Sequence, residues 1–238
     1  MVIPLVFLAF LAAPARSSPL SARSGPERAR LVELFSSEGC SSCPPADAWV
    51  SSLRRERTLW KAFVPVVFHV TYWDYLGWTD ALADRRYTAR QRAYAAAWGT
   101  ASVYTPGFVL DGAEWRGWGR GAPQAGGETG TLEVSFDGKT VAARFSPASG
   151  EGPFTLHAAR LGFGVERAVE DGENAGRNLR HDFVALSLAE APLKHGADGW
   201  RGSSAVPAAK FAAPSQGFAA WVTDGDGRVV QAAGASPP

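Results

Sequence analysis

The sequence predicts an α/β fold whose first half mixes strands and helices and whose second half is a small all-β sandwich. Three observations predict it. The 238 residues are 46% hydrophobic and 20% charged, which is typical of a folded globular chain and excludes disorder. Nine Trp and 26 Gly beside one Met indicate loops anchored by aromatic residues rather than a helical bundle. Strand-like and helix-like runs alternate early in the chain, and only strand-like runs follow.

The charge balance limits the class of partner. Lys and Arg total 24 against 23 Asp and Glu, so the chain lacks the basic surface that binding to a phosphate backbone requires. We therefore expect no nucleic-acid partner. We also expect no cofactor.

The N-terminus predicts export. An uncharged apolar run from Val2 to Ala13 ends in Ala13-Pro14-Ala15, a cleavage-like triplet. We interpret residues 1–15 as a signal peptide and residues 16–28 as a mobile leader, although no basic residue precedes the run. The run is shorter than the roughly 20 residues of a membrane span. We expect a periplasmic or secreted protein with no membrane span in the mature chain.

The two cysteines, Cys40 and Cys43, are only three residues apart. A disulfide that closes so short a loop constrains the unfolded chain little, so redox chemistry is the better explanation for the pair. A strand is predicted at 31–35, and Pro44 and Pro45 favour a helix start directly after Cys43. At a helix N-terminus a thiol has a pKa of about 3.5–7.5. We expect Cys40 to be the nucleophile and Cys43 the resolving thiol.

Three other interpretations of the pair stay open. It can be half of a zinc site, although no further cysteine exists and the four histidines are scattered. It can bind Cu(I) together with His69, because thiolates suit that ion. It can also be a permanently closed, inert disulfide.

Several blocks along the chain resemble one family. Residues 31–47 are similar to the opening of the DUF1223 family of exported bacterial proteins, and further matches follow in order at 69–78, 90–94, 103–106 and 172–177. That resemblance implies membership of the thioredoxin-like superfamily. A strand predicted at 64–70 and a helix at 88–98 give the order of elements that such a fold requires. We therefore expect a thioredoxin-like domain over residues 29–114.

The resemblance also implies a role for Thr105-Pro106. In the superfamily this proline is cis and lies against the cysteine pair, where an extended substrate strand can bind. We expect Pro106 to belong to the catalytic site and Thr105 to contact substrate, with protein thiols or disulfides as partners. An ordinary trans proline at the start of a strand is the alternative.

The segment 72–80 holds four aromatic residues in seven positions and predicts a loop. Trp73 and Trp78 either form a substrate-binding wall beside the cysteines or cap the core. His69, at the end of its predicted strand, either tunes Cys40 or is a buried histidine with structural partners.

The second half begins after a glycine-rich linker at 115–130, and residues 131–238 predict a β-sandwich-like accessory domain. Alternating apolar residues around Asp137-Gly138 predict a hairpin. One polar block, Gly172–Asp182, does not fit a sandwich core: its Arg177, Arg180 and His181 can clamp an anion or pack against the first domain. The alternative, which we favour, is a solvated connection between strands. Together these features favour a thiol–disulfide oxidoreductase. The alternatives are a non-catalytic binding or adaptor module with an inert disulfide, and a copper-handling thiol protein.

Overall fold

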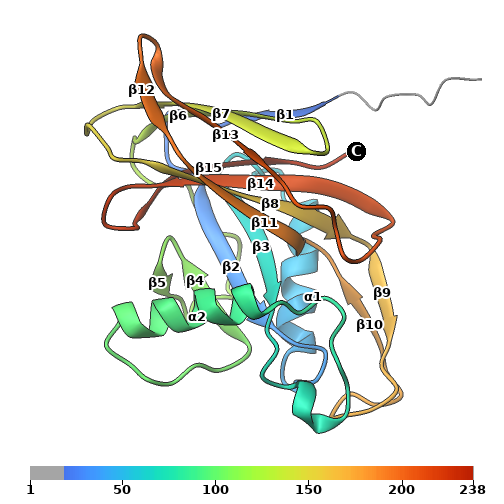
Figure 1. Ribbon diagram of the computed structural model, residues 1–238. Helices are drawn as coiled ribbons and strands as arrows, with labels where there is room; N and C mark the ends of the chain where they lie inside the picture. Colours follow the sequence, from blue (N-terminus) through green and yellow to red (C-terminus); the bar gives the residue numbers. More distant parts are fainter. Residues whose placement is uncertain (1–18, 238) are drawn as a thin grey trace, which may run out of the picture.

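The computed structural model describes residues 19–237 and is mostly β, with about 43% of residues in strands and 13% in helices (Figure 1). The predicted signal peptide at 1–15 lies outside the described residues. The described residues form two α-helices, α1 (Pro44–Ser52) and α2 (Arg85–Ala97), and two short 3₁₀ turns, η1 (Leu53–Arg55) and η2 (Asp74–Leu76). No helix in this described part is long and apolar enough to cross a membrane.

The described strands form one large sheet, a second sheet and a two-stranded ribbon. The large sheet has, in spatial order, β15 (Val229–Ala235), β14 (Ser215–Thr223), β8 (Thr155–Phe163), β11 (Val184–Pro192), β3 (Phe63–His69), β2 (Arg30–Ser36), β4 (Gly107–Leu110) and β5 (Ala113–Glu114). The second sheet has β1 (Leu20–Arg23), β6 (Gly130–Phe136), β7 (Thr140–Pro147), β13 (Gly199–Ala205) and β12 (Lys194–Gly196). The ribbon pairs β9 (Val165–Ala168) with β10 (Asn178–His181).

This arrangement overturns the predicted fold class. The chain is not a thioredoxin-like α/β domain followed by a separate sandwich, because strands from both halves share one eight-stranded sheet. The junction is the parallel pairing of β11 with β3, where Val184 lies opposite Val67. The apolar run of β14 is buried on both faces, as expected of a strand inside a covered sheet. Local periodicity identifies such a strand but does not specify its partner.

The two helices cover opposite faces of the sheet around β2 and β3. Successive side chains of a strand point to opposite faces. Phe35 and Phe68 stack on each other at 5.6 Å and pack against α2, while Ser36 bonds Asp47 of α1. His69 follows Phe68 and therefore lies on the α1 face. Ser36 and His69 therefore lie on the same face of the sheet, the one covered by α1, whose N-cap is Cys43.

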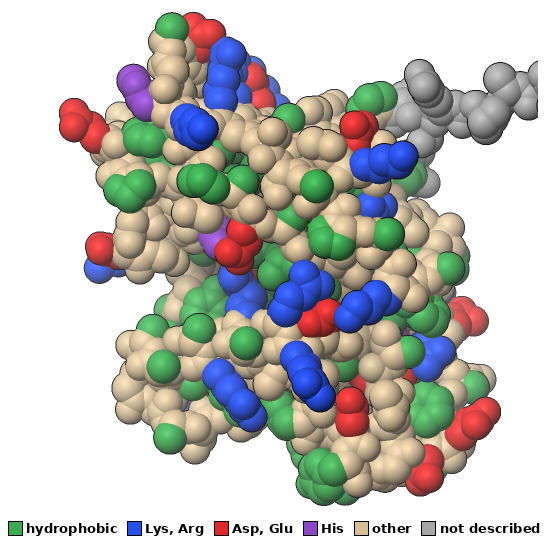
Figure 2. Space-filling model, in the orientation of Figure 1, with side chains coloured by type: hydrophobic (Ala, Val, Ile, Leu, Met, Phe, Trp, Pro, Cys, Tyr) green, Lys and Arg blue, Asp and Glu red, His purple; other side chains and the backbone are tan. Residues whose placement is uncertain are grey.

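A buried ion pair fixes α2 on its face of the sheet. Glu33 in the middle of β2 is fully buried, and Arg90 of α2 donates to it at 2.6 Å. The hydroxyl of Tyr94 donates to the same carboxylate at 2.6 Å. Basic side chains gather over α2 on the face shown in Figure 2, and the helix carries Arg85, Arg86, Arg90 and Arg92.

The second sheet packs on the β8–β14–β15 side of the large sheet. The predicted hairpin is confirmed, because β6 pairs antiparallel with β7 around the turn at Asp137 and Gly138. Their inward side chains form a core with Leu156, Phe218 and other residues of the large sheet. Residues 20–23, placed by the sequence in the leader, form β1 against β6. In the predicted linker, Trp115 and Trp118 pack on Trp49 of α1.

Candidate functional site

The cysteine pair lies between β2 and α1, as the sequence predicts. Cys40 and Cys43 are joined by a disulfide with their Cα atoms 5.5 Å apart. Cys43 is the N-cap of α1, and its backbone carbonyl accepts from the N–H groups of Ala46 and Asp47. Its sulfur therefore sits at the positive end of the helix dipole, which stabilises a thiolate. Both cysteines are buried, at 1% and 0% exposure, so exposure does not distinguish their roles.

The Thr105–Pro106 segment lies against the pair. The bond between these two residues is cis, as the resemblance implies. The carbonyl oxygen of Thr105 is 3.8 Å from the Sγ of Cys40 and accepts from the hydroxyl of Ser42 at 3.5 Å. The indole N–H of Trp73 donates to the Thr105 hydroxyl at 2.8 Å. Four of the predicted site residues, Cys40, Cys43, Thr105 and Trp73, are thus brought together.

Trp78 has a different environment from Trp73. Trp73 packs closely on Gly39, where an added Cβ would meet the Trp73 Cβ at 3.0 Å, so a larger residue beside the cysteine loop would require Trp73 to shift by a few tenths of an ångström. The Trp78 indole instead donates to Glu38 at 2.7 Å, and its ring lies under Arg167. Both tryptophans are half-buried. Trp73 is therefore the aromatic residue that borders the disulfide through Gly39 and Thr105.

The polar block of the second half covers the cysteine loop. Asn174 is fully buried, and its side-chain amide donates to the backbone carbonyls of Glu38 and Cys40 at 2.8 and 2.9 Å. Glu173 accepts from the backbone N–H of Ser41 at 2.9 Å. Packing against the first half is therefore the role that the contacts of Asn174 and Glu173 support, rather than a solvated connection between strands.

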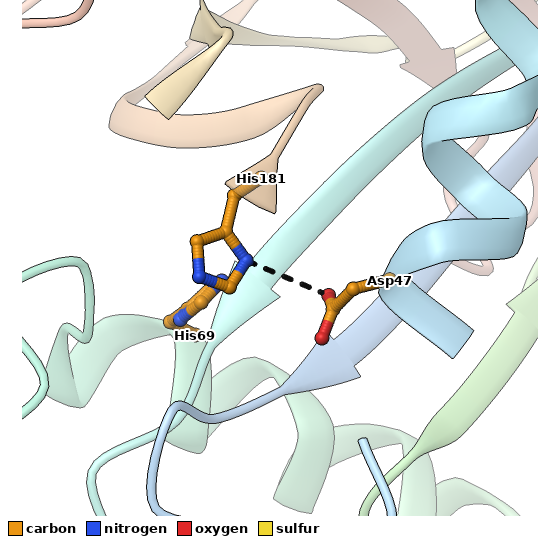
Figure 3. A group of neighbouring side chains, drawn as sticks. All are labelled: Asp47, His69 and His181. Carbon is orange, nitrogen blue, oxygen red and sulfur yellow. Dashed lines mark ion pairs between the residues drawn. The ribbon is translucent and has the colours of Figure 1, made fainter. Parts of the chain in front are cut away.

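A cluster of buried ionisable side chains lies on the α1 face of the sheet. Figure 3 shows the rings of His69 from β3 and His181 from β10 beside the carboxylate of Asp47 from α1. The donor atoms of these three side chains lie within 4.8 Å of one another. Two further carboxylates, Glu38 and Asp80, are buried against the histidines.

Asp80 holds the orientation of His69. The two side chains are 2.6 Å apart, through Nδ1 of the ring, and both are buried. Burial alone lowers the pKa of His69, but the carboxylate of Asp80, together with those of Asp47 and Glu38, outweighs burial and raises the pKa to about 9. Burial raises the pKa of Asp47, opposed by the nearby histidines and by the Ser36 hydroxyl at 2.8 Å. His69 is thus a buried histidine with a carboxylate partner, the second of the two roles predicted for it.

A cleft of about 820 Å³ runs between α1 and β10 and reaches this cluster. Asp47 and His181 lie on its lining, together with Pro44 at the start of α1. Four arginines also line it: Arg54, Arg55, Arg177 and Arg180. Two of them share the carboxylate of Asp182, which pairs with Arg54 at 2.8 Å and with Arg180 at 3.7 Å and so balances one of their two charges.

The family model described as "Protein of unknown function (DUF1223)" matches residues 31–223. The chain belongs to the DUF1223 family. Among curated proteins, none matches this DUF1223 sequence. Solved structures do: protein AGR_C_4864 of Agrobacterium tumefaciens is 25% identical with a TM-score of 0.62, over 88% of this chain and 95% of that one. HBP35 of Porphyromonas gingivalis is 12% identical with a TM-score of 0.57, over 90% and 76%, and shows similarity of fold alone.

Sequence reasoning missed the buried carboxylates of this DUF1223 protein. Asp47 comes four residues after Cys43, on the helix face that also buries Ala46 and Val50, and that spacing was a usable signal. Glu38 and Asp80 carried no comparable signal, because each lies in a loop. His181 was singled out in the polar block, but its approach to His69 depends on the pairing of β10 with β9 and could not be read locally.

Proposed function

We propose that this DUF1223 protein is a thiol–disulfide oxidoreductase that uses Cys40 and Cys43. The observation that carries the proposal is the placement of the pair: Cys43 caps α1, and the Thr105 carbonyl lies beside the Cys40 sulfur. The helix end favours a thiolate. The Thr105–Pro106 backbone offers a position next to the sulfur where an extended peptide can lie.

In the proposed reaction the Cys40 thiolate attacks one sulfur of a substrate disulfide. A mixed disulfide forms and the first substrate thiolate leaves. The Cys43 thiolate then attacks the Cys40 sulfur, closes the Cys40–Cys43 bond and releases the second substrate thiolate. Two electrons pass from the dithiol to the substrate, whose two sulfurs take up two protons. The reverse sequence oxidises a substrate dithiol.

We also propose that the protein acts in the periplasm or outside the cell. The apolar run at 2–13 followed by Ala13-Pro14-Ala15 supports export. A disulfide persists in oxidising compartments, which is consistent with the closed Cys40–Cys43 bond.

The burial of both cysteines favours a second candidate, a binding module in which the disulfide is structural. In that case the pair stays oxidised and the surrounding groups serve packing. The two candidates differ in whether the bond opens under mild reductants.

The test is a redox titration in glutathione buffers followed by a turnover assay. If the protein is a thiol–disulfide oxidoreductase, the Cys40–Cys43 bond should have a reduction potential within the range of known exchange proteins, about −120 to −270 mV. The reduced protein should also reduce a peptide disulfide catalytically. Cys40→Ser and Cys43→Ser variants abolish turnover. If the Cys40–Cys43 disulfide of the folded protein stays closed even when the buffer potential falls below about −300 mV, the proposal is contradicted and the binding module is supported.

A further inference from the structure

The buried histidines have ring nitrogens without hydrogen-bond partners. Both nitrogens of His181 and the Nε2 of His69 lack a partner, and all three atoms are inaccessible to solvent. A buried polar group left without a partner costs about 1–3 kcal/mol, so three in one cluster call for an explanation. All three belong to rings that lie 4.8 Å apart, centroid to centroid.

The charges around these rings are also unbalanced. Three buried carboxylates, those of Glu38, Asp47 and Asp80, surround the histidines. One guanidinium reaches them, because Arg167 donates to Glu38 at 3.2 Å. With all three carboxylates ionised and His69 deprotonated, as a metal-bound imidazole is, the described residues of the cluster have room for two further positive charges.

We propose that Asp47, His69 and His181 bind a divalent transition-metal ion of the Zn²⁺ type. Two imidazoles and one carboxylate are a donor set that such ions take, and three protein ligands leave a coordination position for water or an exchangeable ligand. A dication supplies positive charge that balances the carboxylates, and it accepts one lone pair from each ring, from Nε2 of His69 and Nδ1 of His181. The remaining nitrogen of His181, Nε2, then carries the proton and faces Glu38 at 3.5 Å.

The distances favour an ion over direct hydrogen bonds. The Nδ1 of His181 is 4.0 Å from the Oδ1 of Asp47, which is too long for a hydrogen bond. In tetrahedral coordination two atoms that are each bound at about 2.1 Å lie about 3.4 Å apart, so this pair has to approach by about 0.6 Å to hold an ion between them. The widest separation within the set, 4.8 Å, has to close by about 1.4 Å for regular tetrahedral binding.

The second layer of contacts matches that of a metal site. A metal-bound histidine commonly donates its other ring N–H to a carboxylate, which fixes the tautomer. Asp80 lies 2.6 Å from the Nδ1 of His69 and leaves Nε2 for the metal. Ser36 donates to Asp47 and orients that carboxylate in the same way. The cleft that Asp47 and His181 line gives the ion a route from solvent.

The test is a Zn²⁺ titration of the oxidised protein, in which the closed disulfide removes both thiols as ligands. The wild type should bind one equivalent. Asp47→Asn and His181→Gln should each weaken binding by more than the roughly 10–100-fold that loss of an outer partner such as Asp80 costs. His195→Gln, which alters an exposed histidine in β12, should bind like the wild type.

A measurement on the wild type covers the case in which a variant fails to fold. X-ray absorption of the oxidised protein loaded with Co²⁺ should show two imidazole ligands and no sulfur. Absence of stoichiometric binding, a sulfur ligand, or an equal loss of affinity in His195→Gln would each overturn the proposal. Because the disulfide stays closed throughout, these outcomes do not depend on whether the cysteines are catalytic.

Discussion

The side-chain amide of Asn174 donates to the backbone carbonyl of Cys40 at 2.9 Å, across 134 residues of sequence. This bond ties a loop of the second half to the cysteine pair. Both cysteines are buried, so we expect this loop to limit how reagents reach the disulfide.

Asn174→Ala should destabilise the fold and expose the disulfide. It leaves the carbonyls of Glu38 and Cys40 without their side-chain donor, which costs about 1–3 kcal/mol. Urea unfolding measures the stability, and the rate of reduction by dithiothreitol measures access. Asn178→Ala, an exposed position on β10, is the matched control and should change neither. An unchanged reduction rate in Asn174→Ala would show that the loop does not shield the disulfide.

Trp73→Phe should slow thiol–disulfide exchange more than it lowers stability. The ring remains, but the bond from the indole N–H to Thr105 is lost, which costs about 1 kcal/mol. The Thr105 carbonyl beside Cys40 is then less well positioned. Thr105→Val removes the same bond, so the double variant should lose little more than either single one. If the losses in kcat/KM of Trp73→Phe and Thr105→Val add up in the double variant, the two substitutions do not act through the same hydrogen bond.

Arg90→Met should cost about 3–5 kcal/mol of folding stability, because it leaves the Glu33 carboxylate buried without its cation. Glu33→Leu combined with Arg90→Met should recover most of that loss, since an apolar pair of similar volume replaces the ion pair. Chemical denaturation of the two variants and the wild type gives the comparison. A double variant as unstable as Arg90→Met alone would disprove the desolvation argument.

Asp84 caps α2, and its charge predicts a pH dependence. Its side chain accepts from the backbone N–H of Arg86; partial burial opposes ionisation, but bonds to Arg86 and Lys210 lower its pKa from 3.8 to about 2. Because the pKa of Asp84 is lower in the folded than in the unfolded chain, its ionised carboxylate stabilises the fold at pH values above the unfolded pKa. This stabilisation is lost as the pH falls through about 2. Asp84→Asn keeps the cap and should remove this part of the acid sensitivity. Acid unfolding curves that coincide for Asp84→Asn and the wild type would contradict a contribution of the Asp84 charge to acid sensitivity.

The sequence was informative where the structure is local. The strand before Cys40, the helix after Cys43 and the hairpin at Asp137 follow from periodicity, proline position and turn residues. The fold class was wrong because the join between the halves, β11 on β3, is a contact between residues more than 100 positions apart. Neither propensity nor spacing encodes such a pairing.

The same limit applies to the site. The cysteines and Thr105-Pro106 were predicted from motifs that lie within a few residues. The buried cluster draws Asp47, His69 and His181 from two halves of the chain, and its carboxylates look in sequence like ordinary loop and helix-surface acids. Burial, which gives them their chemistry, is a property of the assembled sheet.

Trapping of a mixed disulfide tests the proposed exchange reaction most directly. Reduced Cys43→Ser protein is mixed with a peptide disulfide, and the products are resolved by mass spectrometry. The account predicts a stable adduct between Cys40 and one half of the peptide, which the wild type resolves at once through Cys43. Cys40→Ser should give far less adduct under the same conditions. Absence of an adduct from folded Cys43→Ser protein would contradict thiol–disulfide exchange at this site.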